Sequence, residues 1–214
     1  MIAIVYRVLI LYPLLIFSVT MHEYFHGLVA EKFGDDTARY SGRLTLNPLA
    51  HIDFFGTFLL PMLAIITGAP VFGWAKPVPV DPYRLNNPRK DMIFIGLAGP
   101  AINLLIAVAS AAIVRIIINI ETFYFVIPFF QYMIILNVIL GVFNMVPIPP
   151  LDGSRVLSGL LPPHLAFQYE KITPYGFFIV LFLLMSGILG TVMGPVLNFI
   201  VSMLLDISKL RSIL

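Results

Sequence analysis

The chain has 214 residues, of which 59% are hydrophobic and only 11% are charged, whereas soluble domains usually carry about 25% charged residues. This composition predicts an integral membrane protein, and the formal charge of +2, with basic residues scattered through loops, excludes a nucleic-acid-binding surface. Because the chain has no Cys, disulfides and thiolate ligands are excluded, and any metal site has to use His and carboxylate groups.

The first predicted helix covers about residues 4–33 and ends at the turn-forming run Gly34-Asp35-Asp36. Its apolar start has the length of a signal peptide, but Arg7 is its one basic residue and no A-x-A site follows. We therefore expect this segment to be retained as a membrane helix that carries His22, Glu23 and His26 near its end.

Residues 37–50 alternate partly between polar and apolar positions and contain Gly42 and Pro48. This pattern favours a short hairpin or extended strand over another helix. Residues 54–67 are apolar, but they are short for a membrane span and are interrupted by glycine and proline, so we expect a re-entrant or interfacial segment. The Pro-rich stretch that follows, residues 68–82, is predicted to be extended.

Two long spans are predicted next, over about residues 92–120 and 125–145, and the first contains small residues that permit close approach of helices. The second ends at a run of prolines that forces an extended path just before Asp152. The last apolar region, residues 176–205, fits either one tilted span or two shorter pieces.

These elements predict an all-α multi-spanning membrane protein with about four to six transmembrane or re-entrant segments and a small β or extended insertion. No internal repeat, linker or low-complexity tract marks a boundary. We therefore expect residues 1–214 to form a single integral-membrane domain.

The sequence His22-Glu23-Tyr24-Phe25-His26 matches the pattern H-E-x-x-H. Two His four residues apart lie on one face of a helix and can share a metal ion. Each ionisable side chain in an apolar span costs about 2.5 to 3.5 kcal/mol on insertion scales, and metal coordination would offset that cost. The context therefore favours a metal site over a chance match.

A catalytic zinc ion needs a third protein ligand and an open position for water. The candidates are Asp152, His51, His164 and a few acidic residues in loops. Asp152 is favoured because irregular backbone is tolerated at membrane depth only where it is buried in protein or lines a wet cavity. His51 with Asp53 could guide a substrate or bind a second ion, although a polar pair at a loop edge more often faces water.

Four motifs in a fixed order resemble the site-2 protease family of intramembrane metalloproteases, in its compact prokaryotic branch without a PDZ domain. They are HEYFHG at 22–27, GWAKPVPV at 73–80, AGPAIN at 98–103 and NMVPIPPLDG at 144–153. Together they span about residues 20–160, and this order makes the resemblance far more specific than H-E-x-x-H alone.

The resemblance implies that one Zn²⁺ per chain is bound by His22, His26 and Asp152, and that Glu23 is the general base. Asn144 resembles the residue of the family that orients the substrate or stabilises the oxyanion. The implied substrates are membrane proteins or signal peptides, cut in transmembrane or juxtamembrane segments.

The shared ligand set constrains the topology, because His26 and Asp152 must lie within about 4 Å of each other to bind one ion. Both residues are near the trailing ends of their helices, so those helices must run in the same direction. With one return helix between them, residues 54–67 must not be a full span.

This arrangement places residues 31–53, 68–91 and 150–175 on one side of the membrane, and the positive-inside rule makes that side cytoplasmic. We therefore expect a multi-pass protein of the cell membrane with its active site towards the cytoplasmic face. The nine basic residues of these loops are Lys32, Arg39, Arg43, Lys76, Arg84, Arg89, Lys90, Arg155 and Lys171.

Two other functions compete with proteolysis. A non-catalytic membrane scaffold that binds zinc on the same fold would need the metal ligands but not Glu23. A metal transporter would carry ionisable residues at several depths along a pathway, whereas the spans from 92 and 125 are nearly free of acids. Neither the oligomeric state nor the physiological substrate follows from the sequence.

Overall fold

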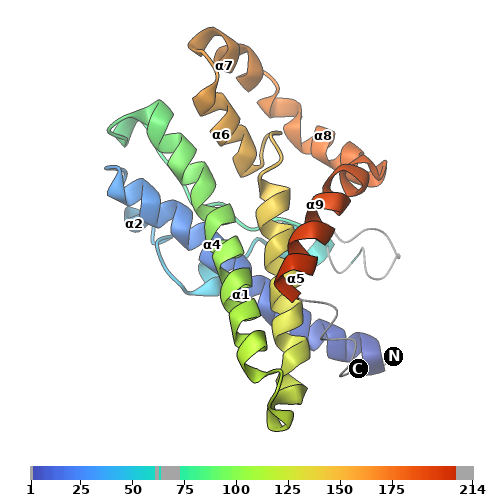
Figure 1. Ribbon diagram of the computed structural model, residues 1–214. Coiled ribbons are helices and arrows are strands. Elements are labelled where there is room, and N and C mark those ends of the chain that lie inside the picture. Colours follow the sequence, from blue (N-terminus) through green and yellow to red (C-terminus); the bar gives the residue numbers. More distant parts are fainter. Residues whose placement is uncertain (1, 61–62, 64–72, 206–214) are drawn as a thin grey trace.

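The computed structural model describes residues 2–60, 63 and 73–205, and within them the regular structure is helical, with no strand. The chain is thus an all-α membrane protein (Figure 1). The helices are α1 (Ile2–Lys32), α2 (Thr37–Tyr40), α4 (Pro88–Ile117), α5 (Ile127–Asn144), α6 (Asp152–Leu160), α7 (Pro163–Glu170), α8 (Thr173–Met185) and α9 (Ile188–Leu205). Single turns cover Pro48–Ala50, Phe54–Leu59, Pro82–Arg84 and Glu121–Val126.

Three of the described helical segments are long and apolar enough to cross a membrane: Pro88–Ile117, Glu121–Asn144 and Ile188–Leu205. In Figure 1, α1 and α5 both run upward, and α4 runs downward across α1 and beside α5, which is the arrangement that a shared ligand set requires. Helix α4 is the central element because it packs against α1, α5 and α6. The organisation as one domain over residues 1–214 stays a prediction.

The hairpin predicted for residues 37–50 is wrong. Residues Thr37–Tyr40 form the short helix α2, and bends and a single turn follow. One polar position of this segment contacts a neighbouring loop: the buried Arg43 side chain donates to the carbonyls of Lys76 and Pro77 at 2.6 and 3.2 Å. Partial alternation over a few residues does not distinguish strand pairing from contacts of this kind.

The prediction for residues 54–67 is only partly open to comparison. Residues Phe54–Leu59 form a single π-helical turn that is capped by the Asp53 carboxylate, which accepts from the Gly56 amide at 2.7 Å. Residues 61–62 and 64–67 lie outside the described residues, so the re-entrant path stays a prediction. Residues 73–81 have no regular secondary structure, and no strand occurs among the described residues, so a small β insertion is not found there.

The last apolar region is divided into α8 and α9. The division falls at Gly187, whose φ of +77° is favourable for glycine and strained for other residues. Helix α8 has 13 residues and is too short to cross a bilayer of about 30 Å at 1.5 Å per residue. The sequence left open one tilted span or two shorter pieces, and the structure shows two pieces.

Candidate metal centre

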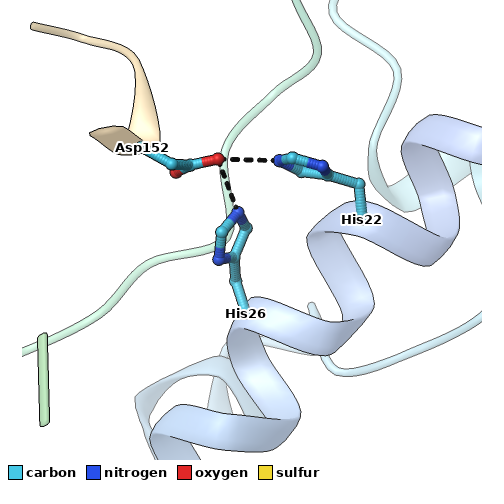
Figure 2. A group of neighbouring side chains, drawn as sticks. All are labelled: His22, His26 and Asp152. Carbon is cyan, nitrogen blue, oxygen red and sulfur yellow. Dashed lines mark hydrogen bonds and ion pairs between the residues drawn. The ribbon is translucent and has the colours of Figure 1, made fainter. Parts of the chain in front are cut away.

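Side chains from two separate helices meet at one point beside α4. His22 and His26 extend from the same face of α1, and Asp152 reaches them from the first residue of α6 (Figure 2). One carboxylate oxygen, Asp152 Oδ2, lies 2.9 Å from His22 Nε2 and 3.1 Å from His26 Nε2. All three side chains are buried, and their ligand atoms lie within 4.8 Å of one another.

The second nitrogen of each imidazole has an acceptor of its own. His22 Nδ1 lies 2.6 Å from Asn103 Oδ1, and His26 Nδ1 lies 2.6 Å from the carbonyl oxygen of Ile95. A carbonyl oxygen only accepts, so Nδ1 carries the proton in both rings, and the neutral form of each ring then presents a bare Nε2.

This protonation pattern points to a cation in the cluster. Two bare Nε2 atoms and a carboxylate oxygen would present lone pairs to one another at 2.9 and 3.1 Å, which is unfavourable unless positive charge lies among them. Two buried imidazolium ions could supply it only at a high desolvation cost, whereas one divalent metal ion satisfies all three groups.

The donor set fits zinc. Tetrahedral zinc with bonds of about 2.0 to 2.2 Å holds its ligand atoms about 3.3 Å apart, close to the observed separations. Two imidazoles and one carboxylate also form a typical three-ligand set of a catalytic zinc site with one open position. Gly99 provides the space: a Cβ atom at that position would lie 2.5 Å from the Nε2 atoms of both His22 and His26.

Asp152 supplies the carboxylate of this cluster. It begins α6 and lies outside the candidate spans. Burial opposes its ionisation, and only positive charge at the His22 and His26 side of the cluster would outweigh burial and hold the pKa of the Asp152 carboxyl well below its usual range. Its second oxygen, Oδ1, lies 3.5 Å from an Arg155 guanidinium nitrogen. The carboxylate therefore turns one oxygen to the histidines and the other to a cation.

Comparison with known proteins places this site in a family. Peptidase family M50 matches residues 10–122 and 111–187, which together cover most of the chain. The chain belongs to peptidase family M50. It is therefore an intramembrane metalloprotease with zinc as its cofactor.

Individual relatives of this M50 peptidase come from bacteria and archaea. YwhC of Bacillus subtilis is 39% identical over 192 residues, covering 86% of this chain and 84% of the relative. Rip2 of Mycolicibacterium smegmatis is 32% identical, covering 81% of this chain and 65% of the relative. A protein named zinc metalloprotease MJ0392, from Methanocaldococcus jannaschii, is 25% identical, with 85% of this chain and 43% of the relative covered. No solved structure matches this M50 peptidase.

Glu23 of the M50 motif faces the extended segment that follows residue 72. One of its carboxylate oxygens accepts a hydrogen bond from the Val78 amide at 2.8 Å. Two residues earlier in this segment, the Lys76 amide donates to the His51 carbonyl at 2.9 Å. Pro77, between these two residues, has no N–H. A peptide strand that paired with the segment along the side of Pro77 would therefore lack one backbone donor.

The other candidate residues from the sequence do not join the cluster of His22, His26 and Asp152. Asn144 ends α5, and its amide nitrogen donates to the Leu140 carbonyl of its own helix at 3.0 Å. His51 is buried, with Nε2 2.8 Å from the Thr45 carbonyl oxygen. His164 is exposed on α7.

Sequence reasoning assigned no contact with the histidines to the three residues of α4 that approach them, Ile95, Gly99 and Asn103. The small residues of this span predict close packing of helices, which is correct for Gly99, but the partner surface consists of the two imidazole rings. Asn103 received no role of its own. A fully polar side chain in the middle of an apolar span was the signal that could have identified it.

Proposed function

We propose that His22, His26 and Asp152 are the zinc ligands of this peptidase and that Glu23 is its general base. The observation that carries the proposal is the meeting of three buried ligand atoms within 4.8 Å, with the other nitrogen of each imidazole already bonded. A buried set of this kind has little use in an apolar protein without a metal ion.

The proposed reaction is hydrolysis of a peptide bond without a covalent intermediate. When bound, zinc would supply a Lewis acid for the scissile carbonyl and would lower the pKa of a water molecule towards about 7. Glu23 accepts the proton of the attacking water and passes it to the leaving amine. The Val78 amide, 2.8 Å from the Glu23 carboxylate, holds that carboxylate in one orientation.

The proposed substrates are transmembrane or juxtamembrane segments of membrane proteins, including signal peptides. A helical substrate must unwind before its peptide bonds are accessible. The unwound backbone then needs hydrogen-bond partners within the protein. Asn144 is proposed to donate to the substrate carbonyl, for which its amide has to exchange its bond with Leu140 for one with the substrate.

The proposed location is the cell membrane, with the centre opening towards the cytoplasmic face. The support is the distribution of basic residues, because residues 31–53, 68–91 and 150–175 together carry nine Lys and Arg. The positive-inside rule assigns such loops to the cytoplasm.

Glu23→Gln is the variant that tests the proposal, with zinc content and cleavage of a transmembrane substrate measured on the same detergent-purified protein. The amide cannot accept the water proton, so we expect about one zinc per chain in both proteins and cleavage only by the unaltered chain. Glu31→Gln is the matched control, because it makes the same change on the same helix where the carboxylate pairs with Arg39 at the surface.

Each result bears on a different part of the proposal. Cleavage by Glu23→Gln at a rate like that of the unaltered chain would remove Glu23 from the base role. A chain without zinc would overturn the ligand assignment. Zinc without cleavage of any substrate in a broad panel would favour the zinc-binding scaffold.

A further inference from the structure

We infer that Asn103 is a positioning residue of the metal centre: it holds the His22 ring with Nδ1 protonated and Nε2 free for the metal. The inference rests on the proposed role of His22 as a ligand. Asn103 lies on α4, is completely buried and places its Oδ1 2.6 Å from His22 Nδ1.

Asn103 is one end of a buried polar network that joins three helices. Its amide nitrogen lies 2.8 Å from Asn137 Oδ1 on α5 and 3.3 Å from the Ser18 carbonyl on α1. The Asn137 amide nitrogen in turn donates to Ser18 Oγ and to the Met133 carbonyl, each at 2.9 Å. The Ser18 hydroxyl donates to the Leu14 carbonyl at 2.8 Å.

The direction of every proton in this network is determined. The Met133 carbonyl can only accept, so the Asn137 nitrogen must face it, and the same nitrogen donates to the Ser18 oxygen. The Asn137 oxygen therefore points towards Asn103. The Asn103 nitrogen must then donate to that oxygen. The Asn103 oxygen is left facing His22, where it can only accept.

The two histidines differ in what holds them. The Nδ1 proton of His26 is accepted by a backbone carbonyl, at Ile95, which no substitution of a side chain removes. The Nδ1 proton of His22 depends on a side chain alone. Since a second partner on a ligating imidazole sets its tautomer and raises its basicity, the loss of Asn103 should weaken the centre through His22 only.

Zinc affinity, measured on detergent-purified protein by competition with a chromogenic chelator, tests the inference in Asn103→Leu. We expect affinity to fall by about 10- to 100-fold, the range for loss of such a partner. Asn137→Leu is the matched control, because it replaces an equally buried amide in the same network without touching His22. For it we expect a fall of less than about 3-fold, since the Ser18 carbonyl still holds the Asn103 amide.

A double-mutant cycle separates positioning from general damage to the fold. The loss of affinity caused by Asn103→Leu should persist in a His26→Ala background and vanish in a His22→Ala background. An equal loss in both backgrounds, or an equal loss in Asn137→Leu, would overturn the inference. A wild-type chain that binds no zinc would instead overturn the proposed ligand set, and wild-type affinity in Asn103→Leu would overturn the role of Asn103 while leaving that ligand set standing.

Discussion

The two halves of α4 bury different kinds of surface within one continuous helix. The half that includes Ile95, Gly99 and Asn103 lies against the histidines of α1, and it offers them a carbonyl, an absent side chain and an amide. The half that includes Ala107 and Ala111 packs against α5 and α9 in an apolar cluster. The first half provides two polar partners for the histidines, and the second provides van der Waals contact.

The difference shows how a membrane protein separates stability from chemistry. In lipid the hydrophobic effect does not hold helices together, so small residues and close packing must do so, as they do in the second half. The first half combines apolar packing, as at Ile95, with buried polar groups, and those groups are stable there only when they have partners. Substitutions in the first half should therefore act on the metal, and those in the second half on folding.

The largest effect is expected from Asp152→Asn, which removes the anionic ligand and leaves the side-chain volume nearly unchanged. Zinc affinity should fall on the order of 100-fold or more, since structural zinc sites gain about 10 to 16 kcal/mol from some four ligands. The thermal midpoint of the unaltered chain should rise when zinc is added, because a ligand that binds only the folded state stabilises it. The midpoint of Asp152→Asn should not move at the same zinc concentration. An equal rise in both would show that zinc stabilises the protein elsewhere.

A smaller effect, about 10- to 100-fold on zinc affinity, is expected from Gly99→Ala. The new Cβ would lie 2.5 Å from both Nε2 atoms, so the rings must move from the positions that their Nδ1 partners fix. Gly190→Ala in α9 is the control, because a Cβ there has no neighbour within 4 Å. Isothermal titration of the two variants should separate them clearly. Equal zinc affinities of Gly99→Ala and Gly190→Ala would mean that Gly99 does not limit the space around the two imidazole rings.

The contrast between Gly99 and Gly190 also shows what the sequence alone allows. The small residues of the span from 92 predict close approach of helices, and the spacing of His22 and His26 is enough to place two candidate ligands on one face. What lies opposite a glycine depends on how two helices are aligned, which is a tertiary property that local pattern does not encode. The same limit applies to the wrong hairpin at residues 37–50, where the partner of Arg43 is a loop 33 residues away in the sequence.

In the second half of α4 and its partner, Ile134→Ala should affect folding and spare the metal. Ile134 is fully buried on α5 within the apolar cluster, and truncation of such a side chain costs about 2 kcal/mol or more through lost packing. Unfolding of the zinc-free protein, followed by circular dichroism in mixed micelles, should show this loss. Zinc affinity should stay within about 3-fold of that of the unaltered chain. A loss of affinity as large as that in Gly99→Ala would break the division between the two halves.

The smallest effect is expected from Arg155→Met, which tests how far the polar region extends beyond α4. The guanidinium lies 3.5 Å from Asp152 Oδ1, and 30% of the Arg155 side chain is exposed, so water already screens the pair. We expect zinc affinity to fall by only about 2- to 5-fold, and the difference to shrink further when the salt concentration is raised. Arg155→Lys, which keeps a positive charge, should restore most of the loss. The contrary result is a loss of zinc affinity that is as large as in Gly99→Ala and does not change with salt. Such a loss would mean that solvent does not screen the pair of Arg155 and Asp152, because screening by water and salt weakens only exposed charges.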